Sequence, residues 1–254
     1  MKNLYLFFLV TGLLLCGTPV LSIAQETEIV RKTWVDDYEA LLQKYVTPKG
    51  VRYKAWHQSK TDIAALDQVI AAIAEQPLGK LDRDAKLAFY LNAYNAWILH
   101  RILQDYPTDG PGGGGFFGRN RFFRSDDLNV AGSKTSFSDL ENEIIRPKFA
   151  EPRIHFALNC ASESCPPLHT LAFRKETLDA TLTALATAFV NDNPNGVQLV
   201  DAGKKVQLSK IFDWYEDDFR GGPVTYINRF RKSEISAAAR VEFQDYSWNL
   251  NEAR

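Results

Sequence analysis

The chain of 254 residues is poor in sulfur, with three cysteines and a single methionine, Met1. It also lacks an excess of charge of either sign, because 30 basic residues face 31 acidic ones for a formal net charge of −1. This balance gives the whole chain no electrostatic footprint for nucleic acid or for an anionic membrane. Two thiols and one histidine that lie close in the sequence lack an obvious fourth metal ligand. We therefore predict no nucleic-acid partner, no metal and no cofactor.

Long apolar runs are missing beyond the first 24 residues, so no membrane-spanning segment is predicted in the mature chain. The N-terminus itself has a positive charge, an apolar run over Leu4–Leu15 and a small-x-small cleavage site before Gln25. We predict a signal peptide over residues 1–24, one domain over residues 25–254, and export to the periplasm or out of the cell. A lipid-anchored form through Cys16 is disfavoured, because the residue before it is bulky.

The hydrophobic periodicity is mainly helical. The segment 82–105 is apolar around nearly its whole circumference, which is typical of a helix buried at the centre of a domain. We also expect helices over 28–45, 61–75 and 176–190, and helices that start near 138 and 209. Extended pieces are expected at 127–130, 134–137, 153–159 and 243–251, with a hairpin that joins 197–200 to 205–208. The predicted fold is α+β: a helix-rich single domain with a buried central helix and a small, mainly antiparallel sheet.

Residues 107–127 interrupt this pattern. Four consecutive glycines are followed by Phe116-Phe117 and Phe122-Phe123, with three arginines between and after these pairs. A glycine run has no preferred conformation, and long loops in compact domains are usually functional or disordered. We expect a flexible insertion here, with a lid over a site as the alternative.

The segment 153–168 carries the residues best suited to chemistry: His155, Cys160 and Cys165. A thiol and an imidazole are the side chains most easily tuned near neutral pH. Alternation over residues 153–159 predicts a strand, which would point His155 and Cys160 to opposite faces unless the chain bends. Cys165 has the better route to the histidine, because the four residues before it can turn back.

Several roles remain open for the two cysteines. A pair five positions apart in an exported protein can form a disulfide, either structural or redox-active. A free catalytic thiol is the third alternative, with Cys160 or Cys165 as nucleophile and His155 as base. Glu141 could orient that base, or it could complete the cap of a helix that begins at Ser138. We count the two cysteines, His155 and Glu141 as candidate catalytic residues.

Polar side chains within the apolar helix offer a second set of candidates. Asn92 and Asn95 lie one turn apart there, and they either line a pocket or form a network that fixes neighbouring loops. Arg146 could pair with an acid or meet a substrate carboxylate. We predict Asn92, Tyr94, Asn95 and Arg146 as substrate-binding residues. Three aromatic residues further on, Trp214, Tyr215 and Trp248, are expected in the core.

Five motifs together resemble the domain of unknown function 547 family, over about Val51 to Leu250. They are Leu87–Ala96 (LAFYLNAYNA), Ser138–Glu141 with Ile145–Pro147, Arg153–Leu168 (RIHFALNCASESCPPL), Leu208–Tyr215 (LSKIFDWY) and Asp245–Trp248 (DYSW). Plant relatives joined to glutaredoxin-like modules imply thiol chemistry, and the arrangement is similar to papain-like or transglutaminase-like cysteine enzymes. Relatives often have histidine directly after the residue matching Glu141, where this chain has Asn142.

Two functions follow from these residues. The first is a cysteine-dependent hydrolase or transferase acting on an amide or thioester, or a thiol–disulfide enzyme acting on a small thiol or peptide, with an asparagine amide or a backbone N–H at the oxyanion. The second is a non-catalytic module with a structural Cys160–Cys165 disulfide, whose glycine-rich loop engages a partner in the cell envelope.

Overall fold

Helix α4 (Arg83–Gln104) runs through the centre of the structure, a computed structural model that describes residues 33–253. It starts where expected, since the Asp82 carboxylate caps it by accepting the N–H of Ala85 at 2.8 Å. Side chains all around the helix are buried between Leu87 and Leu103. The prediction of a buried central helix is therefore confirmed.

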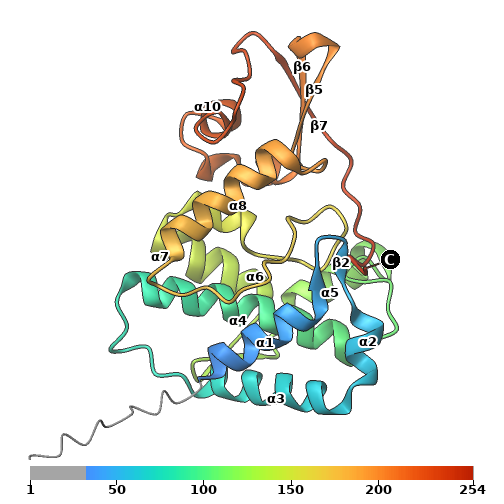
Figure 1. The fold of residues 1–254 in the computed structure, drawn as a ribbon, viewed down its shortest axis with the longest axis vertical. Helices are drawn as coiled ribbons and strands as arrows, with labels where there is room; N and C mark the ends of the chain where they lie inside the picture. The colour runs from blue at the N-terminus through green and yellow to red at the C-terminus, as the bar shows by residue number, and fades with distance from the viewer. Residues whose placement is uncertain (1–32, 254) are drawn as a thin grey trace, which may run out of the picture. The chain divides into compact units, whose positions relative to one another are not determined.

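Three helices from the first part of the chain pack on and around α4. They are α1 (Trp34–Tyr45), α2 (Tyr53–Gln58) and α3 (Lys60–Glu75). In Figure 1, α1 and α3 lie side by side below α4, and α3 contacts both of the others. A capping box at Thr33 starts α1, and the expected first turn before it falls outside the described residues.

The segment expected to be a flexible insertion contains helix α5 (Gly115–Arg124), so that prediction is wrong. Gly114 takes the left-handed conformation, with φ of 74°, and lets the chain turn into the helix. Phe122 and Phe123 then pack against Phe137. These aromatic contacts supply the stabilisation that the glycines alone could not.

After α5 the chain forms several short elements around α4. A two-stranded antiparallel hairpin is followed by a helical stretch that changes type twice, from α to π and back to α. The elements are β3 (Leu128–Val130), β4 (Ser133–Thr135), α6 (Phe137–Asp139), a π-helical turn (Leu140–Ile145), α7 (Arg146–Phe149) and a 3₁₀ helix (Pro152–Phe156).

The last part of the chain builds a second hydrophobic cluster around α8 (Leu178–Asp192) and a three-stranded sheet. The hairpin of β5 (Val197–Val200) and β6 (Lys205–Leu208) is antiparallel, as expected, and β7 (Arg240–Phe243) adds to β6 in parallel. The remaining elements are α9 (Ile211–Trp214), α10 (Pro223–Asn228) and 3₁₀ turns at Asp201–Gly203 and Glu216–Asp218. Beyond β7 the expected strand over 243–251 is absent, and only isolated bridges remain among the described residues there.

Helices dominate, and each sheet is small, which confirms the predicted α+β class. A third sheet, formed by the two-residue strands β1 (Val46–Thr47) and β2 (Gly50–Val51), is antiparallel. Among residues 33–253, no helix has the length and apolar character needed to cross a bilayer.

The end of the chain returns to the N-terminal helices at β2. The N–H of Val51 donates to the carbonyl of Asn251 at 2.9 Å, and the N–H of Ala253 donates to the carbonyl of Val51 at 2.9 Å. Gly50 makes this close approach possible: its φ is +118°, and a Cβ there would lie 2.3 Å from the carbonyl oxygen of Asn251. The C-terminal segment is therefore held against the first half of the chain by backbone contacts that need a glycine.

Replacing Gly50 with alanine should lower the free energy of unfolding by about 2 kcal/mol or more, because it adds both a backbone strain and a steric clash. Gly79→Ala is the matched control, since Gly79 has no atom within 4 Å of its Cβ position. Urea denaturation followed by circular dichroism measures both variants. Equal stability of the two variants would contradict the close approach at Gly50.

Candidate active site

The cysteine segment begins as a 3₁₀ helix over Pro152–Phe156, where alternation predicted a strand. All residues from 154 to 159 are buried, so the alternating pattern marks no exposed face. The strand prediction is wrong, because periodicity cannot assign the conformation of a short segment that is buried on every side. Since there is no strand here, the expectation that His155 and Cys160 point to opposite faces no longer applies.

A cavity of about 190 Å³ lies beside this segment. All four residues predicted as catalytic line it, and so does Tyr94. Its walls come from helix α4, the π-helical turn, the cysteine segment, the region of α9 and the C-terminal segment. The residues that line it include Tyr94, Glu141, His155, Cys160, Cys165, Trp214, Tyr215, Tyr246 and Trp248.

The thiol of Cys160 is held by hydroxyl groups from two segments. Its Sγ lies 3.0 Å from Oγ of Ser162 and 3.3 Å from Oη of Tyr246. Burial works against a charged thiolate, but hydrogen bonds to Cys165, Ser162 and Tyr246 outweigh burial and lower the pKa of Cys160 to about 7. A thiol with this pKa is about half ionised near neutral pH, which makes it a nucleophile.

Cys165 has the opposite character. It is buried, and its Sγ accepts the backbone N–H of Cys160 at 2.9 Å. Burial, and next the neighbouring Cys160, raise the pKa of Cys165 well above the usual thiol value. Both cysteines are free thiols, so the disulfide that the spacing allowed is not formed in this structure. The pair consists of one activated and one protonated thiol.

His155 is held between two carboxylates. Its Nε2 lies 2.7 Å from Oδ2 of Asp218, and its Nδ1 lies 3.8 Å from Oε1 of Glu141. The ring stacks on Tyr215 with centroids 4.0 Å apart. No hydrogen bond joins His155 to Cys160 within the described part of the chain. The imidazole is therefore fixed in orientation by acids, and the thiol is activated by other groups.

Asp218, at the end of a 3₁₀ turn, is a member of this cluster that sequence analysis missed. Arg146 donates from Nε to its Oδ2 at 2.7 Å and from Nη2 to its Oδ1 at 3.0 Å. Burial would raise the pKa of Asp218, but hydrogen bonds from His155 and Arg146 outweigh it and hold that pKa well below its usual range. Asn142, the residue that departs from the family pattern, accepts from Nη1 of Arg146 at 2.7 Å. The guanidinium group of Arg146 is thus bound by the protein's own side chains, and it does not line the cavity that contains the thiols.

Glu141 lies within the π-helical turn Leu140–Ile145 and reaches the cavity, with its Oε2 at 3.5 Å from the hydroxyl of Tyr94. The alternative role as a helix cap is wrong. The cap is Ser136, whose Oγ accepts the N–H of Asp139 at 3.0 Å. Such π-helical turns inside α-helices are frequent at functional sites.

The two asparagines of α4 hold backbone and do not line the cavity. Asn92 donates to the carbonyl of Phe173 and accepts its N–H, both at 2.8 Å. Asn95 donates to the carbonyl of Ala157 and accepts the N–H of Asn159, both at 2.9 Å. Both amides are engaged in the polar network that was the alternative to substrate binding, so neither is placed to stabilise an oxyanion. Their substrate-binding role stays a prediction without geometric support.

Aromatic side chains form the outer wall of the cavity. Trp214 is 44% exposed, so the expectation that it belongs to the core is wrong. It stacks on Trp248 with ring centroids 5.6 Å apart, and Tyr246 packs against both. Tyr246 was missed as a site residue because the DYSW motif that contains it lies 86 positions from Cys160, and nothing in the motif links the two. This wall offers apolar surface to a ligand beside the thiol.

Alkylation by iodoacetamide tests the activation of Cys160. We expect its rate to rise with pH around a midpoint near 7, because the thiolate is the reacting form, while Cys165 stays protonated and unreactive. Tyr246→Phe removes a donor to the thiolate, so the pKa should rise and the midpoint should move to higher pH. Peptide mass spectrometry at pH values from about 5 to 9 measures each cysteine separately. A midpoint near the ordinary thiol value in the native protein would contradict this activation.

Comparisons with known proteins identify one family. Residues 78–190 match the family model described as Protein of unknown function, DUF547. No curated protein matches the chain, and no solved structure does. The matched range contains the helix motif, the Ser138–Glu141 motif and the cysteine segment, whereas the motifs at 208–215 and 245–248 lie beyond it. Through residues 78–190, which supply both cysteines, His155 and Glu141, this chain belongs to the DUF547 family of proteins of unknown function.

Proposed function

We propose that this protein catalyses thiol–disulfide exchange on a small thiol or peptide, with Cys160 as the attacking thiolate and Cys165 as the resolving thiol. The observation that carries the proposal is the asymmetry of the pair. Sγ of Cys160 lies 3.0 and 3.3 Å from two hydroxyl oxygens, whereas Cys165 is buried, so hydrogen bonds lower the pKa of Cys160 and burial raises that of Cys165. The attacking thiol of an exchange reaction works best with a pKa near the ambient pH. The second thiol must stay protonated until the mixed disulfide has formed.

The exchange proceeds in two displacements. The Cys160 thiolate attacks one sulfur of a substrate disulfide, that S–S bond breaks, and the other substrate sulfur leaves as a thiolate and takes up a proton. Cys165 then loses its proton and attacks the Cys160 sulfur, which releases the second substrate thiol. One substrate disulfide is reduced to two thiols, and the two protein thiols are oxidised to a disulfide.

The acids and the histidine on the other side of the cavity fit the proton transfers that these steps need. Glu141 lines the same cavity as both thiols and lies 3.8 Å from Nδ1 of His155. Asp218 holds the other ring nitrogen. A carboxylate–imidazole pair that lines the cavity gives a proton to a leaving substrate thiolate there, and this role needs no hydrogen bond to Cys160.

Hydrolysis or acyl transfer at Cys160 is supported less well. Such chemistry needs a base at the thiol and free donors for an oxyanion. His155 makes no hydrogen bond to Cys160 in the described chain, the Asn92 and Asn95 amides bind backbone, and the N–H of Cys160 is bound to Cys165. The likeness to papain-like and transglutaminase-like enzymes stays a prediction.

Oxidised glutathione and Cys165→Ser test the exchange. The native protein should end with no alkylatable thiol, whereas Cys165→Ser should accumulate a mixed disulfide on Cys160, because nothing resolves it. Cys160→Ser should not react. Intact mass after alkylation distinguishes the three results. Exchange would be contradicted if the native protein did not react with oxidised glutathione. Acyl transfer would be favoured if, in addition, Cys165→Ser turned over an aryl thioester at the full native rate.

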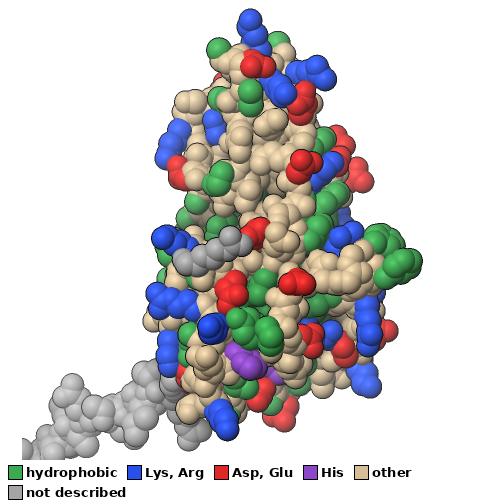
Figure 2. All heavy atoms as spheres, turned by 90° about the vertical axis from the view of Figure 1, so that its right-hand side faces the viewer, with side chains coloured by type: hydrophobic (Ala, Val, Ile, Leu, Met, Phe, Trp, Pro, Cys, Tyr) green, Lys and Arg blue, Asp and Glu red, His purple; other side chains and the backbone are tan. Residues whose placement is uncertain are grey.

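We also infer that helix α5 docks the protein on an anionic membrane surface, which gives physical content to the envelope-binding alternative. Phe116 and Phe117 are 67% and 84% exposed, the highest values among the large hydrophobic residues that the structure describes as exposed. The helix has three arginines and no acidic residue. On the side of the molecule that carries α5, apolar side chains project at one edge with basic side chains close by (Figure 2). Apolar and basic side chains on one helix are typical of interfacial binding, and we propose export, from residues 1–24, as the route to such a surface.

Cosedimentation with vesicles tests this docking. The native protein should bind vesicles rich in phosphatidylglycerol, and the double variant Phe116→Ser, Phe117→Ser should bind about tenfold more weakly or worse, because its apolar contact is lost. Leu199→Ser is the control, since Leu199 is also exposed, at 43%, but lies on β5. Equal binding of the double variant and the control would contradict docking through α5.

A further inference from the structure

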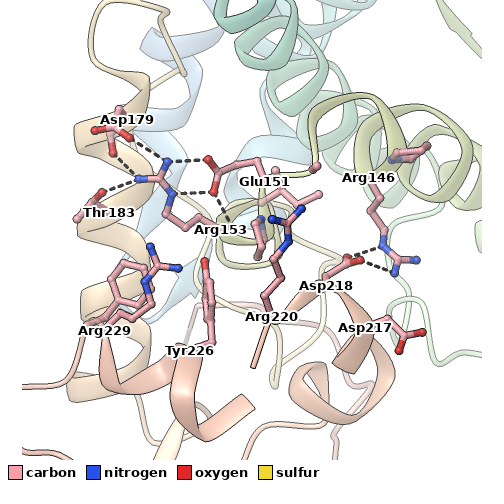
Figure 3. A pocket seen from close by; sticks show the side chains of 15 residues that line it. Arg146, Glu151, Arg153, Asp179, Thr183, Asp217, Asp218, Arg220, Tyr226 and Arg229 are labelled. Carbon is pink, nitrogen blue, oxygen red and sulfur yellow. Dashed lines mark hydrogen bonds and ion pairs between the residues drawn. The ribbon is translucent and has the colours of Figure 1, made fainter. Parts of the chain in front are cut away.

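A second and larger cavity, of about 620 Å³, lies away from the thiols. It is walled by the 3₁₀ helix Pro152–Phe156, by α8 and by α10 (Figure 3). Its walls include four arginines, Arg146, Arg153, Arg220 and Arg229. A guanidinium group is available to a ligand only where no carboxylate of the protein already pairs with it.

Two of the four arginines are fully paired. Arg146 binds Asp218 through two nitrogens, as described above. Arg153 binds Glu151, with contacts of 2.7 and 2.6 Å to its two oxygens, and lies 2.9 Å from Asp179. These pairs brace the walls and leave no guanidinium charge for a ligand.

The other two arginines have no such partner. No carboxylate pairs with Arg220 or Arg229 within residues 33–253. Arg229 is positioned by aromatic rings, with its guanidinium carbon 5.3 Å from the ring centre of Tyr226 and 5.9 Å from that of Phe230. Stacking on rings orients a guanidinium but leaves its N–H donors free for an anion.

Tyr226 adds an independent polar group to the same cavity. Its side chain is buried, with 3% exposure, yet its hydroxyl makes no hydrogen bond within the described chain. Burial raises the pKa of Tyr226 to about 12, so the hydroxyl is a neutral donor at physiological pH. Figure 3 shows the tips of Arg220, Tyr226 and Arg229 pointing to the same side, towards the Glu151–Arg153 pair.

The acids of the cavity do not cancel this arrangement. Asp218, Glu151 and Asp179 are already bound to arginines. Asp217 lies beyond Asp218 as seen from Tyr226 in Figure 3. Two guanidinium groups without a carboxylate partner and one phenolic O–H therefore share one side of the cavity, and each of them is a hydrogen-bond donor.

We propose that this cavity binds a small ligand through an oxyanion group, a carboxylate or a phosphate, held by Arg220, Arg229 and the hydroxyl of Tyr226. Guanidinium groups match both oxyanions in geometry and charge. The site is separate from the thiol cavity, and Asp218, which binds His155, stands between the two. The ligand therefore need not be the substrate of the cysteines.

Isothermal titration calorimetry with inorganic phosphate and with acetate tests the site, at constant ionic strength set by chloride. The native protein should bind at least one of them, and the tighter one identifies the oxyanion. Arg220→Gln and Arg229→Gln should each weaken binding about tenfold, and Tyr226→Phe should weaken it several-fold, because each removes a donor but keeps the fold.

Arg121→Gln is the matched control, since it changes the net charge by the same amount on α5, outside this cavity. Its affinity should stay within about twofold of the native value. Failure of the native protein to bind either anion, or an equal loss of affinity in Arg121→Gln, would overturn the proposal. Thermal melting of each variant shows whether it is folded.

Discussion

The site depends on the hydrogen bonds that Asn95 makes from the buried helix α4. Its amide holds the carbonyl of Ala157 and the N–H of Asn159, and the side chain of Asn159 then binds the N–H of Ala161 and the carbonyl of Pro166. Two asparagines in series thus fix the backbone on both sides of the cysteines. Each buried polar group left unpaired would cost about 1–3 kcal/mol, so this path of the chain is strongly preferred over a shifted one.

That fixed backbone keeps the uncharged hydrogen-bonding groups around Cys160 apart from the carboxylates around His155 within one small cavity. Around Cys160 the neighbours are hydroxyl and thiol groups, which stabilise a negative sulfur through hydrogen bonds without adding charge. The charged acids gather instead around His155, where Arg146 compensates Asp218. Two like charges side by side would each disfavour ionisation of the other. Keeping the carboxylates at the imidazole allows the thiol to ionise in the same cavity.

Which features of the site could be predicted from the sequence depends on how far apart along the chain the interacting residues lie. Helix α4 and its Asp82 cap could be predicted because periodicity and capping are local, and the grouping of His155, Cys160 and Cys165 is a property of one segment. Asp218 and Tyr246 could not be predicted, because each lies more than 60 positions from the residue it binds. The cysteine segment was assigned to a strand, because burial on all sides leaves no difference between faces for a pattern to record.

The C-terminal segment has a consequence for the order in which the site matures. The hydroxyl of Tyr246 forms a hydrogen bond with the thiol of Cys160, and Asn251 anchors the same segment to Val51 in β2. A ribosome makes Tyr246 after Cys160, so a nascent chain carries the thiol before one of the groups that lower its pKa exists. The thiol of such a chain lacks the hydrogen bond with Tyr246, so its pKa is higher until the segment that carries Tyr246 docks. Docking of the C-terminal segment therefore completes the set of hydroxyl groups that lower the pKa of Cys160.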